Sequence, residues 1–166
     1  MKQVAIHDAN IFIDLEVAGL LDLWFQLDYE TITSDIVVSE IEDNHKEVLQ
    51  YIQAGQIRVE QLNSKQMAMV YDMHNNTNSN LAIADCAVLL LSREKAAILL
   101  TGDRCLREAA EGESIEVHGS LWIFDKLVTA GFLQPAIAAN KLEDLLVSNR
   151  FLPRATSYDY IKKWKQ

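Results

Sequence analysis

Short apolar runs typical of β-strands alternate along this chain with segments in which apolar residues recur every three or four positions. The first pattern predicts strands and the second predicts helices. The predicted strands are residues 3–6, 29–33, 57–62, 96–100 and 115–118. The predicted helices begin after residue 8 and at residue 64, include the segment around residue 85, and cover residues 20–27, 34–53, 103–111, 121–130 and 135–147. This alternation predicts a three-layer α/β/α domain with a central, mostly parallel sheet.

Two carboxylates interrupt the most apolar part of the chain, residues 80–103. Asp85 lies inside the apolar run 81–91, and Asp103 follows the apolar run 96–100 after a Thr-Gly turn. Moving a carboxylate out of water is costly unless the group is paired or binds a metal. The position of Asp85 therefore calls for a chemical explanation.

Asp8 and Asp103 occupy equivalent positions, because each follows a predicted strand and precedes a predicted helix. The carboxyl ends of parallel strands lie at one edge of a sheet, where functional groups gather in open α/β folds. We therefore expect these two carboxylates to lie near each other. For Asp8 the alternative is a helix-capping or turn role.

Glu40 belongs to the predicted helix 34–53, whose start carries the capping residues Ser34 and Asp35. Helical spacing places Glu40 on the same face as the apolar Val37 and Ile41. An acid among core positions suits a site at the sheet edge. The alternative is a boundary residue whose carboxylate reaches water.

Four converging carboxylates would repel one another, since two unit charges about 4 Å apart cost about 4 kcal/mol at an effective dielectric constant of about 20. A bound cation would relieve that repulsion. Ligand sets made only of oxygen favour Mg²⁺ or Mn²⁺ over Zn²⁺. Cys86 and Cys105 form no CxxC pair and lie at no ligand spacing from a histidine, so we expect two reduced core thiols. The sequence thus predicts an Mg²⁺ or Mn²⁺ site whose ligands are drawn from Asp8, Glu40, Asp85 and Asp103.

The composition is that of one globular domain, with 166 residues, 49% hydrophobic content and a formal net charge of -9. Such an acidic chain disfavours a large basic surface for nucleic acids. A metal-dependent nuclease is less affected, because bound cations supply part of the positive charge. No apolar run approaches the roughly 20 residues that span a bilayer, and the start of the chain does not resemble a signal peptide. We therefore expect a cytoplasmic protein that does not enter a membrane.

Two polar segments leave alternatives open. The Asn-rich segment 75–80 either moves over a site or only connects two helices. Residues 148–166 contain the one concentrated basic and aromatic stretch of the sequence. A terminal helix there either packs through Tyr158, Ile161 and Trp164 or contacts nucleic acid.

Five stretches of the chain together resemble the PIN domain, including the VapC-type toxin ribonucleases of toxin–antitoxin pairs. They are DANIFID, ITSDIVVSEI, LAIADCAVLLL, ILLTGDRCLREAAE and IEVHGSLWIFDKLVTAGFL, and they cover most of residues 3–133. The resemblance implies a Rossmann-like sandwich that binds Mg²⁺ or Mn²⁺ and cleaves RNA. Residues 1–133 would form the catalytic domain, with residues 134–166 as a helical extension packed on it.

The resemblance also implies roles for individual residues. Asp8, Asp85 and Asp103 match acids that hold the metal, and Glu40 matches an acid that binds it through water or orients the nucleophile. Asn10 and Thr101 match supporting polar residues. For Asp14, Asp125 and His118 the alternatives are assistance at the site or surface and helix-boundary roles, and we expect the latter.

The chain departs from the family pattern after Asp103, where Arg104, Cys105 and Leu106 stand in place of a further Asp that many members carry. That substitution counts against a complete second metal site. The expected function is a metal-dependent endoribonuclease, with RNA as substrate and with an antitoxin protein or a second copy of the chain as candidate partners. The alternative is a catalytically silent PIN-like module that binds RNA or protein. A dehalogenase-type phosphatase is disfavoured, because that chemistry requires an Asp where Asn10 stands.

Overall fold

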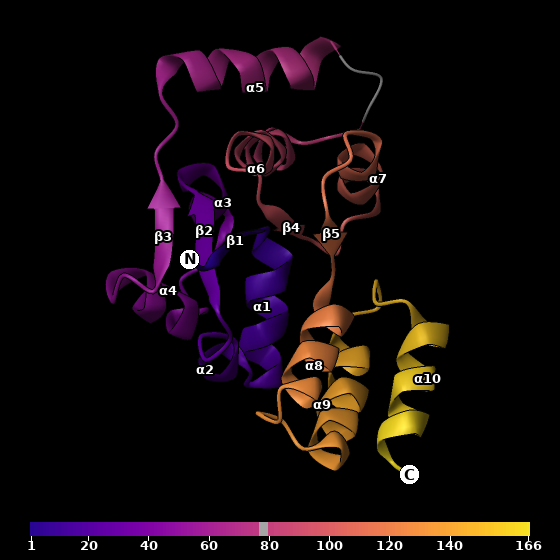
Figure 1. The fold of residues 1–166 in the computed structure, drawn as a ribbon. Helices are drawn as coiled ribbons and strands as arrows, with labels where there is room; N and C mark the ends of the chain where they lie inside the picture. Colours follow the sequence, from indigo (N-terminus) through magenta and orange to yellow (C-terminus); the bar gives the residue numbers. More distant parts are fainter. Residues whose placement is uncertain (77–79) are drawn as a thin grey trace.

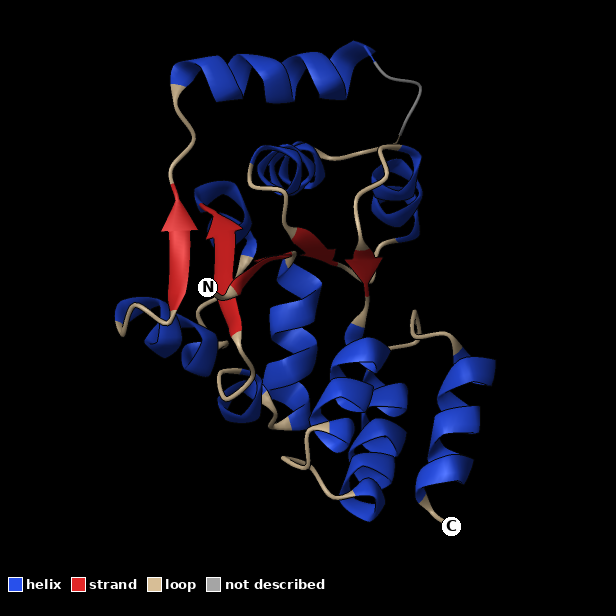
Figure 2. Ribbon diagram, in the orientation of Figure 1, coloured by secondary structure: helices blue, strands red, loops and turns tan. Residues whose placement is uncertain are grey.

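A parallel five-stranded sheet forms the centre of the computed structural model, which describes residues 1–76 and 80–166 (Figure 2). The strand order is β3-β2-β1-β4-β5, and every strand pairing in the described residues is parallel. The strands are β1 (Gln3–His7), β2 (Tyr29–Ser34), β3 (Ile57–Glu60), β4 (Ile98–Leu100) and β5 (Val117–His118). The predicted α/β class and parallel sheet are confirmed.

Helices cover both faces of this sheet (Figure 1). The face that carries α6 (Ile83–Glu94) is also covered by α3 (Asp35–Glu40), α5 (Ser64–Asn76) and α7 (Arg104–Gly112). The opposite face is covered by α1 (Ala9–Ala18), α2 (Leu21–Trp24), α4 (Lys46–Gln53), α8 (Ser120–Thr129), α9 (Pro135–Ser148) and α10 (Arg154–Trp164). None of the helices in the described part of the chain combines the length and apolar character needed to cross a membrane.

The strands contribute side chains to two hydrophobic cores, one on each face of the sheet, because successive strand residues point to opposite sides. In β4, Ile98 and Leu100 enter the core with α1 and α8, whereas Leu99 enters the core with α6 and α7. In β1, Ala5 and Ile6 divide in the same way. Burial on both faces explains why these strands read as continuous apolar runs.

The strand order reverses its direction at β1. After β1 the chain adds β2 and β3 on one side, and it then crosses over to place β4 and β5 on the other side. His7 of β1 is paired in register with Leu100 of β4. The residues that follow, Asp8 and Thr101, therefore leave the sheet side by side. In open parallel sheets, such a reversal point is where the crevice for a ligand forms.

The predicted helix 34–53 is wrong as a single element, because the structure contains α3 and α4 with a break between them. Ile41 has extended backbone angles (φ -81, ψ 117), and its side chain is buried. The amide of His45 then donates to the carbonyl of Glu42 in a turn around Asp43 and Asn44. Asp and Asn favour turns over helix interiors, since their side chains compete for backbone hydrogen bonds. The helix predicted for residues 20–27 is likewise reduced to the short α2.

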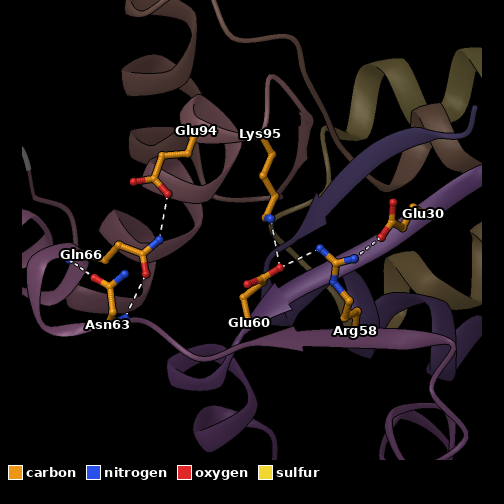
Figure 3. A network of polar contacts seen from close by, with 7 residues as sticks. All are labelled: Glu30, Arg58, Glu60, Asn63, Gln66, Glu94 and Lys95. Atoms are coloured by element: carbon orange, nitrogen blue, oxygen red, sulfur yellow. Dashed lines mark hydrogen bonds and ion pairs between the residues drawn. The ribbon is translucent and has the colours of Figure 1, made fainter.

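Charged side chains at the end of the sheet tie β3 to its neighbours (Figure 3). Arg58 donates to Glu30 of β2 at 2.6 Å and to Glu60 at 2.7 Å. Lys95, just after α6, pairs with Glu60 at 3.0 Å. These ion pairs satisfy the charges of the edge strand β3, and they lie in a network separate from the carboxylates that follow β1 and β4.

The C-terminal helix α10 packs against α9, as the amphipathic pattern predicts in part. Ile161 and Trp164 are buried, in agreement with that prediction. Tyr158 is 54% exposed, so the expectation that it packs inward is wrong, and Ser157 is buried in its place on the inner face. The predicted connection 75–80 falls partly in residues 77–79, which lie outside the described residues.

Candidate functional site

Asp8 stands where β1 ends, and both of its carboxylate oxygens are hydrogen-bonded. Its backbone amide donates to the Leu100 carbonyl at 2.9 Å, which continues the pairing of β1 with β4. Oδ1 accepts from the Ala9 amide at 2.8 Å, so Asp8 is the N-cap of α1. Oδ2 accepts from the Thr101 hydroxyl at 2.8 Å. Asp8 is 5% exposed, and its hydrogen bonds hold the carboxylate where β1 and β4 end.

Thr101 links Asp8 to Asp103. Its hydroxyl oxygen accepts from the Asp103 amide at 3.0 Å while its proton is donated to Asp8. Asn10 supports the same turn, because its Oδ1 accepts from the Gly102 amide at 3.1 Å. The two residues predicted to support the site, Asn10 and Thr101, thus join the segment after β1 to the segment after β4.

Asp103 and Asp85 also stand at helix N-termini. Asp103 is the N-cap of α7, with its Oδ1 accepting from the Leu106 amide at 2.8 Å. Asp85 lies in the first turn of α6, and its Oδ2 accepts from the Ala82 amide at 2.8 Å. The positive end of a helix dipole favours a negative charge at each place. The capping role considered for Asp8 from the sequence is therefore real, and it applies to all three aspartates.

Glu40 is the last residue of α3, which packs against α6. Its side chain is exposed, unlike the half-buried Asp85. Partial burial of its carboxylate raises the pKa of Glu40, and the negative charge of Asp85 raises it further. Glu40 is thus coupled electrostatically to Asp85, and also to Asp8, while remaining open to solvent.

The four acids, which we call the carboxylate cluster (Asp8, Glu40, Asp85 and Asp103), act on one another's charge. Burial raises the pKa of Asp85 to about 6, and the charges of Asp8 and Asp103 act in the same direction against the Ala82 hydrogen bond. Burial also raises the pKa of Asp8, with smaller contributions from Glu40 and Asp103 in that direction and opposing hydrogen bonds from Thr101 and Ala9. Throughout the described ranges, no Lys or Arg forms an ion pair with any of the four. The cluster therefore holds negative charge that no ion pair within the described residues balances.

The donor chemistry of the carboxylate cluster fits a hard divalent cation, because every donor is a carboxylate oxygen. The side chains as they stand form no tight cage: in residues 1–76 and 80–166, no group of three or more His, Cys, Asp or Glu side chains is close enough to hold a metal ion. Mg²⁺ usually keeps several waters and takes one or two protein carboxylates directly, so it needs no such cage. Direct ligation by Asp8, Asp85 and Asp103 stays a prediction.

Asp14 is buried, which corrects the expectation of a surface or boundary position. Its Oδ2 accepts from the Ser120 hydroxyl at 2.7 Å, and Asn149 donates to Oδ1 and Oδ2 at 2.9 and 3.1 Å. Asp14 thereby joins α1 to the start of α8 and the end of α9. The spacing of Asp14 three residues after Ile11 and four before Ala18, both buried, is the signal that could have placed it on the inner face.

The imidazole ring of His7 lies in the core, fully buried. It stacks on Phe12 at 4.7 Å and meets the edge of Trp24 at 4.9 Å. Neither ring nitrogen has a hydrogen-bond partner among the described residues, and burial lowers the pKa of His7 to about 3. His7 is the last residue of β1, one residue beyond the predicted strand 3–6. It is a neutral aromatic of the core at neutral pH.

Three other sequence expectations concern side chains near the site. Cys86 is buried as predicted, but Cys105 is exposed, because it lies on the outer side of α7. His118 is half-buried, its Nε2 lies 2.8 Å from Glu116, and it stacks on Trp122 at 4.3 Å. Asp125 is half-buried on α8.

A protein-family model described as a PIN domain matches residues 4–166 of this chain. The match includes residues 134–166, beyond the stretch 3–133 that carries the sequence motifs. PIN domains are generally nucleases and typically use divalent metals. No curated protein matches the chain.

Proposed function

This chain belongs to the PIN-domain family, and from that premise we propose that it is an endoribonuclease that uses Mg²⁺ or Mn²⁺ to hydrolyse RNA phosphodiester bonds. The observation that carries the proposal is the carboxylate cluster at the strand-order reversal between β1 and β4. Its unbalanced charge and its oxygen donors are what a divalent cation requires. The same position in the sheet is where open α/β folds bind ligands.

The residues of the cluster have separable roles in this proposal. Asp8, Asp85 and Asp103 hold the ion, with Asp8 kept in place by the Thr101 hydroxyl. Glu40 is the exposed member, so it orients the attacking water or binds the ion through water. When bound, a divalent ion lowers the pKa of a bound water and stabilises charge on the phosphate and the leaving oxygen.

The capping hydrogen bonds restrain two of these carboxylates. Oδ1 of Asp103 accepts from the Leu106 amide and Oδ2 of Asp85 from the Ala82 amide, and within residues 1–76 and 80–166 the second oxygen of each accepts no hydrogen bond and can bind an ion. Asn10 restrains the Gly102 amide between Thr101 and Asp103. The chain thus contributes fixed acidic groups, and the cation contributes the positive charge that a phosphate needs in so acidic a protein.

Cleavage of RNA by the purified protein with Mn²⁺ tests the proposal. Asp103→Asn should abolish cleavage, because it removes one charge from the cluster, while the fold is kept, because Asn caps a helix about as well as Asp. Asp144→Asn is the matched control: it removes one charge from an exposed position on α9 and should cleave like the unmodified chain. Equal cleavage by Asp103→Asn and the unmodified chain would refute the site.

A second candidate is a catalytically silent PIN-like module that binds RNA or a protein. Two observations favour it: the described residues contain no preformed three-carboxylate group, and Arg104, Cys105 and Leu106 replace the further Asp of many relatives. It predicts that RNA is not cleaved under any divalent ion, whether the module binds RNA or a protein. Cleavage that depends on Asp103 would eliminate it. An antitoxin partner and a homodimer stay predictions from the family.

A further inference from the structure

A cavity of about 380 Å³ opens beside the carboxylate cluster, between α7, α8 and the connection from α9 to α10. Gly102, the residue between Thr101 and Asp103, forms part of its wall. The cavity and the cluster therefore share one turn of the chain. Its volume is at the small end of the range for ligand pockets, which suits a ligand the size of one nucleotide.

Aromatic side chains supply much of the cavity wall. His118, Trp122, Phe151 and Tyr160 line it, from β5, α8, the α9–α10 connection and α10. The ring of Trp122 already contacts other side chains, because His118 stacks on it at 4.3 Å and the Lys126 ammonium lies 5.2 Å from its centre. Phe151 is 85% exposed and makes no ring contact with another aromatic side chain of the described chain. Its ring therefore remains available for a stacking partner.

Arg107 brings positive charge to the same cavity. Within residues 1–76 and 80–166 it forms no ion pair, and its guanidinium donates a 3.4 Å hydrogen bond to the Thr101 carbonyl. By contrast, Arg58, Arg93 and Arg104 are each paired with a glutamate. A guanidinium with spare donors beside stacking surfaces is suited to a phosphate that belongs to an aromatic ligand.

We propose that this cavity is the subsite for one unpaired nucleotide of the RNA substrate, with Phe151 stacked on its base and Arg107 bound to its phosphate. The inference rests on the proposed endoribonuclease function, because Gly102 lines the cavity and stands between Thr101 and Asp103 of the candidate site. It adds to that function the residues that bind one nucleotide of the substrate beside the carboxylate cluster.

Stacking on the exposed ring of Phe151 requires one face of the base to be free of its neighbours. Bases inside a duplex are stacked on both faces, so the proposed subsite takes a nucleotide from a single strand, a loop or a bulge.

Binding of a short fluorescein-labelled single-stranded RNA, followed by anisotropy in EDTA so that no cleavage occurs, tests the subsite. Phe151→Ala should weaken binding by about 5- to 100-fold, since stacking one base on an aromatic ring has about that effect. Arg107→Gln should weaken binding and reduce the salt dependence, by about 0.7 in the slope of log affinity against log salt. Phe151 is exposed, so its replacement leaves the core intact.

Matched controls lie outside the cavity. Tyr158→Ala removes another exposed aromatic side chain, from the outer face of α10, and Arg93→Gln removes an arginine at the far end of α6. Both should bind like the unmodified chain. A duplex of the same sequence should bind more weakly than the single strand.

The outcomes separate the subsite from the proposed function. If Phe151→Ala and Arg107→Gln bind RNA as tightly as the unmodified chain, or if the duplex binds as tightly as the single strand, the subsite is refuted even when Mn²⁺-dependent cleavage is present. If cleavage is absent while both variants lose affinity in EDTA, the endoribonuclease is refuted and the nucleotide subsite stands.

Discussion

Asp8, Asp85 and Asp103 each serve local structure and the candidate site at once. Each carboxylate accepts a hydrogen bond from an amide at the start of a helix, and each belongs to the carboxylate cluster. A capping interaction holds the side chain in one orientation, and the helix dipole offsets part of the repulsion among like charges. A capping role and a metal-binding role are therefore compatible at these positions.

Asp85→Asn should increase the stability of the protein while removing activity. The pKa of Asp85 is raised from 3.8 to about 6, so between these values the folded state holds a proton that the unfolded state has lost. The free energy of unfolding consequently falls as pH rises through this window, and it stays reduced above about pH 6. Asn carries no charge and still accepts from the Ala82 amide.

Urea unfolding in EDTA measures this effect. Above about pH 6 we expect Asp85→Asn to be more stable than the unmodified chain by on the order of 1–2 kcal/mol, and below about pH 4 the difference should vanish. A variant that is less stable than the unmodified chain at about pH 8 would show that the charge of Asp85 is compensated within the protein.

Among the helices, α1, α8 and α9 are joined through the buried carboxylate of Asp14. Burial raises the pKa of Asp14, whereas the hydrogen bonds from Ser120 and Asn149 lower it. The donors thus favour the charged form that burial disfavours. This contact ties the C-terminal helices to the helix that begins at Asp8.

Asn149→Ala should destabilise the protein by about 1–3 kcal/mol near neutral pH, because it leaves a buried carboxylate with fewer donors. Loss of a donor that favours the charged form raises the pKa of Asp14 further. The destabilisation should therefore be largest where Asp14 is ionised and should shrink as pH falls and Asp14 becomes protonated.

Thermal or urea unfolding of Asn149→Ala across pH is the measurement, with Asn140→Ala, at an exposed position of α9, as the control. An equal loss of stability at neutral and acid pH would mean that the contact is not coupled to the charge of Asp14.

Helices and strands with strong apolar periodicity could be predicted from the sequence. Breaks in which side chains compete for backbone hydrogen bonds could not. The strands around Ile6 and Leu99 are buried on both faces, so their continuous apolar runs predicted them correctly. The break between α3 and α4 depends on turn residues inside an otherwise helical pattern, where local hydrogen bonds win over periodicity. The inward turn of Ser157 in place of Tyr158 depends on how α10 rotates against α9, which no local pattern encodes.

The acidic residues of the candidate site were recognisable in the sequence, whereas the residues around them were not. Position after a strand, combined with parallel order, brings Asp8 and Asp103 to one edge. The cavity beside them is formed by Arg107, His118 and Phe151, which come from α7, β5 and the connection between α9 and α10. The basic and aromatic stretch 148–166 was recognised in the sequence, but no local pattern links Phe151 in it to Arg107 and His118, so the cavity itself was not predicted.

At the scale of the whole molecule, the net charge of -9 conflicts with binding a polyanion unless cations intervene. Paired groups such as Arg58 and Lys95 neutralise part of the surface at β3 (Figure 3), whereas the carboxylate cluster has no such partner in the described chain. A divalent ion at the cluster supplies the positive charge beside the phosphate to be cleaved, and Arg107 supplies positive charge at the proposed nucleotide subsite, where RNA binding does not require the ion.

Calorimetric titration of Mn²⁺ into the protein shows whether the carboxylate cluster binds a divalent ion, with thermal melting to verify that each variant is folded. We predict that the unmodified chain and Asp144→Asn bind Mn²⁺ alike and that Asp8→Asn binds it at least about ten-fold more weakly, since it removes a charge from the centre of the cluster. Absence of Mn²⁺ binding by the unmodified chain, or equal affinity in the folded Asp8→Asn variant, would contradict the account.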